Sequence, residues 1–441
     1  MVVSSPATGA VPSRSRVWVE TWIAAHSYSS FLKKLDYDGA MFQVPPFGRV
    51  DEHWLAEADG RTGRARLADA SGPFQSSVPP LIAAWAPMVP AGLAAESEEA
   101  AAALSAFDSH ARAVLGGASP TLGPMSSILL RTESTSSSQI ENLTVGARQL
   151  ALAELGQANS ENARTVVANV HAMESALELA DRLDTEAVLT MHRTLLSGQP
   201  GWAVHAGRWR EQLVWVGASS VSPRGAAHVA PQASLVPEAM EDLMAFVRRN
   251  DLPVVVQTAV AHAHFENIHP FADGNGRTGR ALVQAMLRGK GLTVSTTAPV
   301  SAGLLVDTPR YFGALTAYRE GDARPVVEEF CAAVRFASSR GSQLIDDLAG
   351  ELERSRAQLA GLRRQASAWR VLPHLLSHPV INGRFLTTQL GLGSQTAQNA
   401  LDQLAGAGVL VERTGQRRNR VWQHSGVLAV LDEFADGLIR R

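Results

Sequence analysis

The stretch from His269 to Arg280, which reads HPFADGNGRTGR, constrains the fold and the chemistry of this chain more than any other segment. His269 ends an apolar run and precedes a proline, so an extended backbone is expected there, at the end of a helix. The following run, GRTGRALVQAMLRGKG, has the composition of a helix, and its N-terminal N–H groups and dipole would face the glycine-rich loop. The sequence therefore predicts two helices joined by an anion-binding loop.

The polar residues of this loop suit phosphate chemistry. A neutral imidazole at His269 can take a proton from an alcohol near neutral pH. The carboxylate of Asp273 is a hard oxygen donor of the kind that Mg²⁺ prefers, together with phosphate oxygens. Gly274 and Gly276 allow the backbone to approach an anion closely and to adopt conformations that other residues avoid. The loop thus has the parts to hold a nucleotide with its metal and to deprotonate an attacking hydroxyl.

Two arginines follow on the predicted helix. Arg277 and Arg280 are spaced i, i+3, so they lie on neighbouring faces and can clamp successive phosphates. Phe271 is expected to be a buried anchor for the loop. A glycine-rich turn with a helix cap and two surface arginines is the plain structural alternative. One arrangement of this loop would give every polar residue a role in binding or reacting with a nucleotide. The stretch therefore indicates a nucleotide-using transferase.

The stretch matches the motif HPFx[DE]GNGRxxR without departure, and on this motif the chain resembles the Fic family. The resemblance implies transfer of a nucleoside monophosphate, usually AMP from ATP, to a tyrosine, threonine or serine hydroxyl of a target protein. It implies that His269 is the catalytic base and that Asp273 binds Mg²⁺. The intact GNGR sequence argues against the related phosphotransferase branch, whose glycine region is altered.

The same resemblance assigns the groups that bind the nucleotide. Asn275 and the N–H groups around Gly274 and Gly276 would form the anion hole, while Arg277 and Arg280 would hold the outer phosphates. ATP as substrate and Mg²⁺ as cofactor are implied by the family alone, because no base-reading motif is visible in the sequence.

A second motif lies N-terminal to the first. Residues 137–142 read SSQIEN, which resembles the family's inhibitory pattern [ST]xxxE[GN] at Ser137, Glu141 and Asn142. Ser137 and Glu141 are spaced i, i+4, so they are expected on one face of a short helix. The resemblance implies that Glu141 pairs with Arg280, where a carboxylate would take the partner of the γ-phosphate and repel it. Inhibition would then be built into the chain, whereas the plain alternative is an ordinary helix after a serine-rich cap.

The composition is that of a globular protein. The chain has 441 residues, of which 45% are hydrophobic and 19% charged, and its net charge of −2 gives no overall attraction to nucleic acid or membranes. The single cysteine, Cys331, lies in an apolar helical run, where a buried thiol is expected. No secretory signal or membrane-spanning stretch is visible, so we expect a location in the cytoplasm of a bacterium.

The distribution of apolar, proline and glycine residues predicts a mainly α fold. We expect five parts in order: a mobile tail (1–20), an N-terminal helical extension (21–160), a Fic catalytic core (161–335), a linker helix (336–365) and a winged helix-turn-helix domain (366–441). The extension should begin with an irregular covering layer and continue with helices over 97–116 and 126–156. The inhibitory helix is placed at about 131–150.

A segment at about 211–231 is expected to be the docking site of the unknown target protein. It contains the β-favouring run LVWV, followed by glycine, serine and proline. It resembles the flap, a small β-hairpin with which Fic proteins hold the target segment by main-chain pairing. A surface loop that covers the core is the alternative.

The last part of the chain is predicted to contain three helices and a two-stranded wing, an order that resembles a winged helix-turn-helix domain. The helices are ASAWRVLPHLLSHP, FLTTQLG and GSQTAQNALDQLAGAG, the third capped by Ser394, and the wing is VLVERTGQRRNRVWQ. The third helix has Asp402 and no lysine or arginine, whereas phosphate contacts need cations. Only the wing supplies cations, at Arg413, Arg417, Arg418 and Arg420. A structural, dimer-forming or target-docking role is therefore favoured over DNA binding.

Three hypotheses for the whole chain stay open at this point. In the first, it is an ATP- and Mg²⁺-dependent protein adenylyltransferase inhibited by Glu141 through Arg280. In the second, a winged-helix regulator of transcription or partner binding uses its Fic core only to sense nucleotide, although such a protein would have no need of His269. In the third, the same site also removes AMP, with Glu141 positioning a water. A homodimer is possible, because many relatives are dimers.

Overall fold

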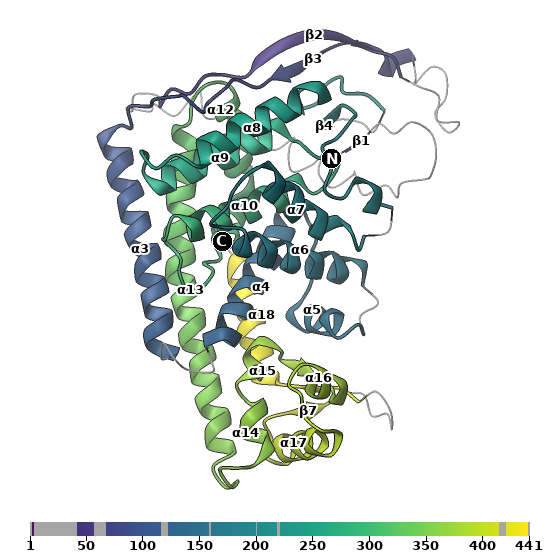
Figure 1. Ribbon diagram of the computed structural model, residues 1–441, viewed down its shortest axis with the longest axis vertical. Coiled ribbons are helices and arrows are strands. Elements are labelled where there is room, and N and C mark those ends of the chain that lie inside the picture. Colours follow the sequence, from purple (N-terminus) through teal and green to yellow (C-terminus); the bar gives the residue numbers. More distant parts are fainter. Residues whose placement is uncertain are drawn as a thin grey trace.

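The computed structural model describes residues 2–3, 42–56, 68–115, 122–157, 160–199, 201–217, 221–413 and 420–439. Apart from residues 2–3, the predicted mobile tail lies outside these ranges, as do Arg417 and Arg418 of the predicted wing. Within them the chain is mainly helical, as the sequence predicts, with three small antiparallel sheets (Figure 1). No helix in these ranges is long and apolar enough to cross a membrane.

Two long helices, α3 (Ala91–Leu115) and α13 (Arg324–Gln358), run side by side along one edge of the molecule (Figure 1). They approach closely at Gly341, where an added Cβ would lie 2.7 Å from the Phe107 ring. α13 continues without interruption across residues 335 and 336, where the sequence analysis separated core from linker. The prediction of a separate linker helix is therefore wrong, because no proline or other helix breaker divides this run.

The catalytic core packs against these two helices. It consists of α6 (Glu161–Glu178), α7 (Thr185–Leu196), α8 (Val236–Val247), α9 (Val254–Ile268), α10 (Asn275–Gly289), α11 (Val300–Leu305) and α12 (Thr308–Arg319), with short 3₁₀ turns η1 (Ala203–His205) and η2 (Ala233–Leu235). Side-chain caps fix the first turns of three helices: Ser160, Asp184 and Asp307 each accept a hydrogen bond from a main-chain N–H three residues later. α9, which leads into the glycine-rich loop, is buried almost all round.

The N-terminal extension is more regular than predicted. Strands β2 (Gly48–Trp54) and β3 (Gly72–Val78) pair in antiparallel register from Gly48↔Val78 to Trp54↔Gly72, where the sequence analysis expected an irregular layer. The expectation failed because β2 exposes most of its side chains and so lacks the alternation that marks a half-buried strand. The ring of Trp54 meets Trp215 in the core, with ring centroids 5.3 Å apart.

The helix predicted over 126–156 is two helices, α4 (Leu122–Ile140) and α5 (Ala147–Glu154). The chain leaves the helical conformation at Asn142, whose φ is 59°. The predicted inhibitory helix at 131–150 therefore spans the end of α4, a turn and the start of α5. This turn places Glu141 at the tip of α4, just beyond the last helical residue.

The segment predicted as a flap contains a small hairpin, as expected. Strand β4 (Val214–Val216) pairs antiparallel with β5 (His228–Val229), with Trp215 opposite Val229. A third strand, β1 (Val2–Val3), pairs with the other edge of β4, so the sheet order is β1-β4-β5. Both edges of β4 are thus occupied by segments of this chain.

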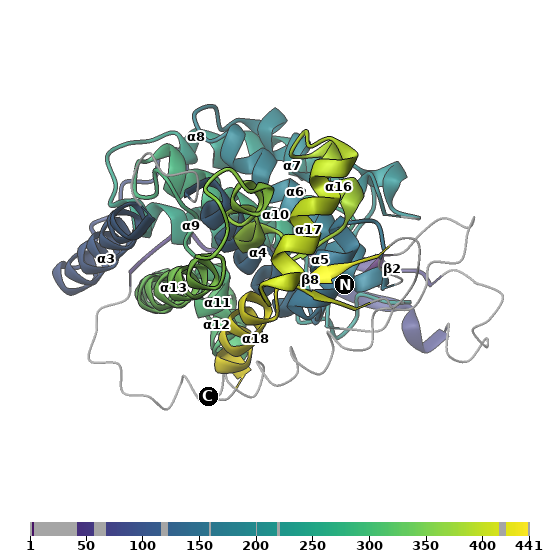
Figure 2. The same ribbon diagram turned by 90° about the horizontal axis from the view of Figure 1, so that it is seen from below.

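The C-terminal unit lies at one end of the molecule (Figures 1 and 2). Its elements are α14 (Ser367–Val371), α15 (His374–Ser377), β6 (Val380–Ile381), α16 (Gly383–Thr388), α17 (Ser394–Gly406), β7 (Val411–Glu412), β8 (Trp422–Gln423) and α18 (Ser425–Ile439). The first predicted helix is two short ones, separated at Pro373. The cap of α17 is Gly393 and not Ser394, and β6 adds a third strand in the order β6-β8-β7. The winged-helix assignment stays a prediction.

The last helix, α18, was not anticipated. It leaves the C-terminal unit and packs against α13 and α5, where Gly426 and Gly437 approach α13 side chains closely. The predicted separation of residues 366–441 as an independent unit is therefore wrong, because α18 returns to the core. Figure 1 shows it, in yellow, next to α4.

Gly303 and Gly350 test how tightly α13 is packed. A Cβ on Gly303 of α11 would lie 2.5 Å from both Cα and O of Ala333 in α13, whereas a Cβ on Gly350 meets only a flexible arginine tip at 3.9 Å. We expect Gly303→Ala to lower the free energy of unfolding by about 1–3 kcal/mol through overpacking. The control is Gly350→Ala in α13. It should raise the free energy of unfolding by about 0.5–1 kcal/mol, because alanine is the better helix former. Urea unfolding would measure both, and equal effects of the two substitutions would contradict this packing.

Candidate active site

The backbone of His269 ends α9 in a left-handed turn. Its N–H still donates to the carbonyl of Phe265 at 2.9 Å, and its φ and ψ are 53° and 60°. The extended conformation predicted from the following proline is therefore wrong, although the position at the end of an apolar helix is right. A non-glycine residue in this conformation is strained and persists only when its surroundings hold it there.

Arg210 is the group that holds this turn. Its guanidinium is buried and donates from Nε to the carbonyl of His269 at 2.8 Å, and from Nη1 to the carbonyl of Gln212 at 2.9 Å. A further donation from Nη2 reaches the carbonyl of Pro231. One side chain thus ties the His269 turn to both ends of the flap. Arg210 was not predicted, because the sequence around a single arginine in a loop does not show which carbonyl groups its side chain will contact.

The proton of the His269 ring can be assigned from its partners. Nδ1 lies 3.0 Å from the carbonyl of Glu266, which can only accept, so Nδ1 carries the hydrogen. Nε2 is buried and has no hydrogen-bond partner within the described residues. Burial lowers the pKa of His269 to about 4. At neutral pH the ring is therefore uncharged, with a free lone pair on Nε2 suited to accept a proton.

The loop after His269 is clamped by two side chains. The side-chain amide of Asn275 accepts from the N–H of Phe271 at 2.8 Å and donates to its carbonyl at 2.9 Å. The Phe271 ring is fully buried, as predicted, and stacks on His192 with a centroid distance of 3.6 Å. His192 in turn donates from Nε2 to the carbonyl of Asp273 at 3.0 Å. The side chain of Asn275 therefore shapes the loop by bonding to both main-chain groups of Phe271. Its assignment to the anion hole stays a prediction.

The glycines of the loop meet two different demands. Gly274 is the N-cap of α10 with φ 76°, a left-handed conformation that favours glycine, and an added Cβ would lie 2.9 Å from Leu195. Gly276 lies at the first turn of α10, where an added Cβ would be 2.5 Å from Oε1 of Glu141. The helix N-terminus is thus open to a close approach by an anion, and in this structure the anion is a carboxylate.

Glu141 contacts both arginines of the motif. Its Oε1 accepts from Nη2 of Arg280 at 2.8 Å, and its Oε2 accepts from Nε of Arg277 at 2.8 Å. Arg280 is held further by Ser137, donating from Nε to the hydroxyl and from Nη2 to the carbonyl, both at 2.8 Å. The predicted pairing of Glu141 with Arg280 is therefore present, and the contact with Arg277 is an addition. All three charged side chains are at least nine-tenths buried.

The conformation of Asn142 accounts for the residue type at the last position of the predicted inhibitory motif. The N–H of Asn142 donates to the carbonyl of Gln139 at 2.8 Å, and the N–H of Leu143 donates to the carbonyl of Ser138 at 3.0 Å. With the left-handed φ of Asn142, this is a Schellman motif, which ends a helix and favours glycine or asparagine at that residue. The helix end directs Glu141 toward α10, so Ser137, Glu141 and Asn142 act through one turn.

A cavity of about 660 Å³ adjoins these groups. Its lining includes the charged or polar side chains of Glu141, His269, Asp273 and Arg280. It also includes Tyr311, Phe312 and Leu315 of α12 and Val216 of the flap. This mixed lining is typical of a site for a small organic molecule with an anionic part.

Asp273 could contribute to a magnesium site. Its side chain is 24% exposed on the cavity wall, and Oδ2 lies 3.1 Å from Nη2 of Arg277. Within the described ranges no group of three histidine, cysteine, aspartate or glutamate side chains is placed to hold a metal. The donor set therefore fits a metal that gains most of its oxygen ligands from a bound phosphate compound and from water, which is the usual habit of Mg²⁺.

The fold and the site define a class: a helical domain in which a neutral histidine faces an arginine-rich anion site at a helix N-terminus. Residues 182–287 match the model of the Fic/DOC family, so this part of the chain is similar to a Fic domain. The match includes the whole motif from His269 to Arg280.

Proteins of similar sequence have been named for their activity. The chain is 31% identical over 152 residues to the protein adenylyltransferase fic-1 of Caenorhabditis elegans, covering 33% of this chain and 26% of that protein. It is 28% identical over 194 residues to the protein adenylyltransferase Fic of Drosophila mojavensis, covering 43% and 34%. The chain thus spans about a quarter to a third of the length of these curated relatives.

Two solved structures resemble the chain more distantly. A Fic family protein from Desulfovibrio desulfuricans covers 73% of this chain and 95% of its own, with 21% identity and a TM-score of 0.42. A fragment of Fic-1 from C. elegans covers 57% and 74%, with 21% identity and a TM-score of 0.43. At scores this low, no feature of the site is inferred from these structures.

Asn142 offers a test of the helix end that needs no activity. Asn142→Gly should keep the stability of the protein or raise it slightly, because glycine adopts the left-handed conformation without strain. Asn142→Val should lower the free energy of unfolding by about 1–3 kcal/mol, because a β-branched residue is strained there. Thermal unfolding would show the difference, and equal midpoints for the two variants would contradict the Schellman motif.

The protonation of His269 can be measured directly by ¹⁵N NMR of the histidine rings. The ring should stay neutral, with its proton on Nδ1, from pH 8 to pH 5.5, because burial lowers its pKa to about 4. An unperturbed histidine would be about 90% protonated at pH 5.5. His171 is an internal control, since its hydrogen bond with Glu174 raises its pKa. Titration of His269 near pH 6.5 would contradict its assignment as a neutral base.

Proposed function

We propose that this protein transfers AMP from ATP to a hydroxyl of a target protein and that Glu141 inhibits the transfer. The observation that supports this most is the neutral His269, whose free Nε2 lies beside a cavity that also contains Asp273 and Arg280. The relatives named as protein adenylyltransferases support the same reaction, although they are matched over only part of their length.

The transfer uses His269 as a general base. The target hydroxyl oxygen attacks the α-phosphorus of ATP and forms a new P–O bond, while its proton passes to Nε2 of His269. The bond from the α-phosphorus to the bridging oxygen of the β-phosphate breaks, and pyrophosphate leaves with the electron pair. The N–H groups at the N-terminus of α10 stabilise the negative charge that develops on the phosphoryl oxygens.

Arg277 and Arg280 would hold the β- and γ-phosphates in this proposal, and Asp273 would hold Mg²⁺. The metal would supply positive charge that offsets the charge of the phosphates. Tyr311, Phe312 and Leu315 also line the cavity and offer apolar surface against which an adenine ring could pack.

Glu141 inhibits by taking the place of the γ-phosphate. Its carboxylate accepts hydrogen bonds from Nη2 of Arg280 and Nε of Arg277, which are the donors that the triphosphate needs. The carboxylate also repels a second anion at short range. Because Glu141 belongs to the same chain, the inhibited state needs no partner. A signal that moves the tip of α4 would release the enzyme.

The target protein is expected at the flap, by main-chain pairing with β4. In this structure β1 pairs with one edge of β4 and β5 with the other. A target segment must therefore displace β1 before it can pair there.

Labelling with α-³²P-ATP and Mg²⁺ tests the proposal. Glu141→Gly should label itself or proteins of a bacterial lysate at least tenfold more strongly than the wild type, because both arginines become free for the triphosphate. The double variant Glu141→Gly/His269→Ala should lose the label, because the proposed general base is removed. Labelling with γ-³²P-ATP should stay at background in all three proteins.

A matched control separates inhibition from loss of structure. Glu133→Gln alters another buried carboxylate of α4, which accepts from Ser301 and lies outside the cavity, so it should not release labelling. Absence of label from Glu141→Gly that still binds ATP, or label that survives His269→Ala, would refute the proposed reaction.

A further inference from the structure

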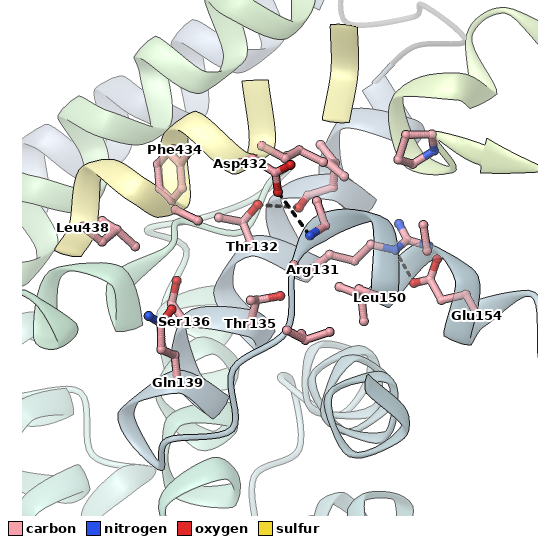
Figure 3. Close-up of a pocket in the computed structure, with 18 of the residues that line it drawn as sticks. Arg131, Thr132, Thr135, Ser136, Gln139, Leu150, Glu154, Asp432, Phe434 and Leu438 are labelled. Carbon is pink, nitrogen blue, oxygen red and sulfur yellow. Dashed lines mark hydrogen bonds and ion pairs between the residues drawn. The ribbon is translucent and has the colours of Figure 1, made fainter. Parts of the chain in front are cut away.

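A second cavity lies on the side of α4 that faces away from the active site (Figure 3). It is a partly open pocket between α4, α5 and α18, with about 630 Å³ of space including adjoining solvent. The α4 residues that line it recur at helical spacing: Ile128, Arg131, Thr132, Thr135, Ser136 and Gln139. Ser137 projects from the opposite face of the same helix, toward Arg280. α4 thus lines this second cavity, and Glu141, which directly follows α4, lines the active-site cavity.

The lining of this cavity has an apolar side and a hydrogen-bonding side. Leu150 of α5 and Leu431, Phe434 and Leu438 of α18 form the apolar side. Hydroxyl and amide groups of Thr132, Thr135, Ser136 and Gln139 form the other (Figure 3). A few polar groups facing an apolar wall are the usual arrangement of a site for a small organic molecule.

The charges around the cavity exclude an anionic occupant. Arg131 forms an ion pair with Glu154, so its positive charge is already balanced. Asp432 of α18 also lines the cavity and accepts from the N–H of Ala147 at 3.3 Å, which adds a further negative charge. Arg131 keeps one buried donor, Nη1, without a hydrogen-bond partner in the part of the chain that is described. The lining therefore favours a neutral molecule with a hydrogen-bond acceptor.

The cavity joins the C-terminal unit to the inhibitory helix. His378, which follows α15, lies 3.2 Å from Nη2 of Arg131 on α4, and Asp432 holds the first turn of α5. A molecule in the cavity would contact α4 and α18 at once. Because residues of α4 line this cavity and Glu141 follows the last residue of α4, a molecule that binds this arrangement of α4 more tightly than any other would stabilise the contact of Glu141 with the two arginines.

We propose that this cavity, the α4–α18 pocket, binds a small neutral molecule with an apolar body and that the bound molecule holds Glu141 on Arg277 and Arg280. The second half of this statement rests on the proposed inhibition by Glu141. The first half does not depend on any activity of the protein.

Binding can be tested with two fluorescent probes that differ in one charge. N-phenyl-1-naphthylamine is neutral, and 8-anilino-1-naphthalenesulfonate has the same rings with a sulfonate. The full-length protein should bind one equivalent of the neutral probe at least tenfold more tightly than the anionic one. Preference for the anionic probe, or no saturable binding of either, would overturn the proposed ligand class.

Substitutions then place the neutral probe. Ala435→Trp in α18 fills the pocket and should weaken binding at least tenfold. If circular dichroism shows that this variant folds poorly, Ala147→Trp in α5 replaces it and should weaken binding by the same amount. The control Ala102→Trp lies on an exposed face of α3 and should bind as the wild type does. Unchanged binding by a folded pocket variant would show that the probe lies elsewhere.

The coupling to Glu141 has its own readout. The neutral probe should slow amide hydrogen exchange at the end of α4 about tenfold in the wild type. By reciprocity, Glu141→Gly should bind the probe at least threefold more weakly. Equal affinity for both proteins, with no change in exchange, would refute the coupling while leaving the pocket intact. None of these measurements uses AMP transfer, so failure of the proposed function and failure of this proposal are distinguishable.

Discussion

The carboxylate of Glu141, held between Arg277 and Arg280, is the interaction on which the rest of the site depends. Two buried guanidinium groups three residues apart repel each other, and a single carboxylate bonded to both compensates them. The geometry needs the end of α4 at Asn142, the Ser137 contacts to Arg280, and Gly276, where a side chain would collide with the carboxylate. In the proposed function a triphosphate needs the same arginine donors, so the Glu141 carboxylate and ATP compete for them.

The position of α4 is in turn set by the packing around it. One face meets α6 and α11 of the core, and the other faces α5 and, from the C-terminal part, α15 and α18. The return of α18 to the core therefore places the C-terminal unit in contact with the helix that ends in Glu141. A unit for which the sequence favours a structural, dimer-forming or target-docking role is thus connected by side-chain packing to the helix that precedes Glu141.

The sequence predicted the local parts of the site well and the long-range parts poorly. The helix α10 and the buried Phe271 were predicted from the residues of a short motif, and the pairing of Glu141 with Arg280 was implied by the resemblance to the Fic family. Arg210 and His192 were missed because their partners are main-chain carbonyls distant in sequence, which no local pattern reveals. The β2–β3 hairpin was missed because its exposed residues do not alternate, and the independence of the C-terminal unit was overestimated because α18 was not recognised.

The most direct test of this account is calorimetric binding of a non-hydrolysable ATP analogue and of AMP to the wild type and to Glu141→Gly. If Glu141 competes with the γ-phosphate, its removal should tighten binding of the ATP analogue at least tenfold, or about 1.4 kcal/mol. Binding of AMP, which has no outer phosphates, should change little. An equal gain for AMP and the ATP analogue, or no gain for either, would contradict the claim that Glu141 occupies the phosphate-binding arginines.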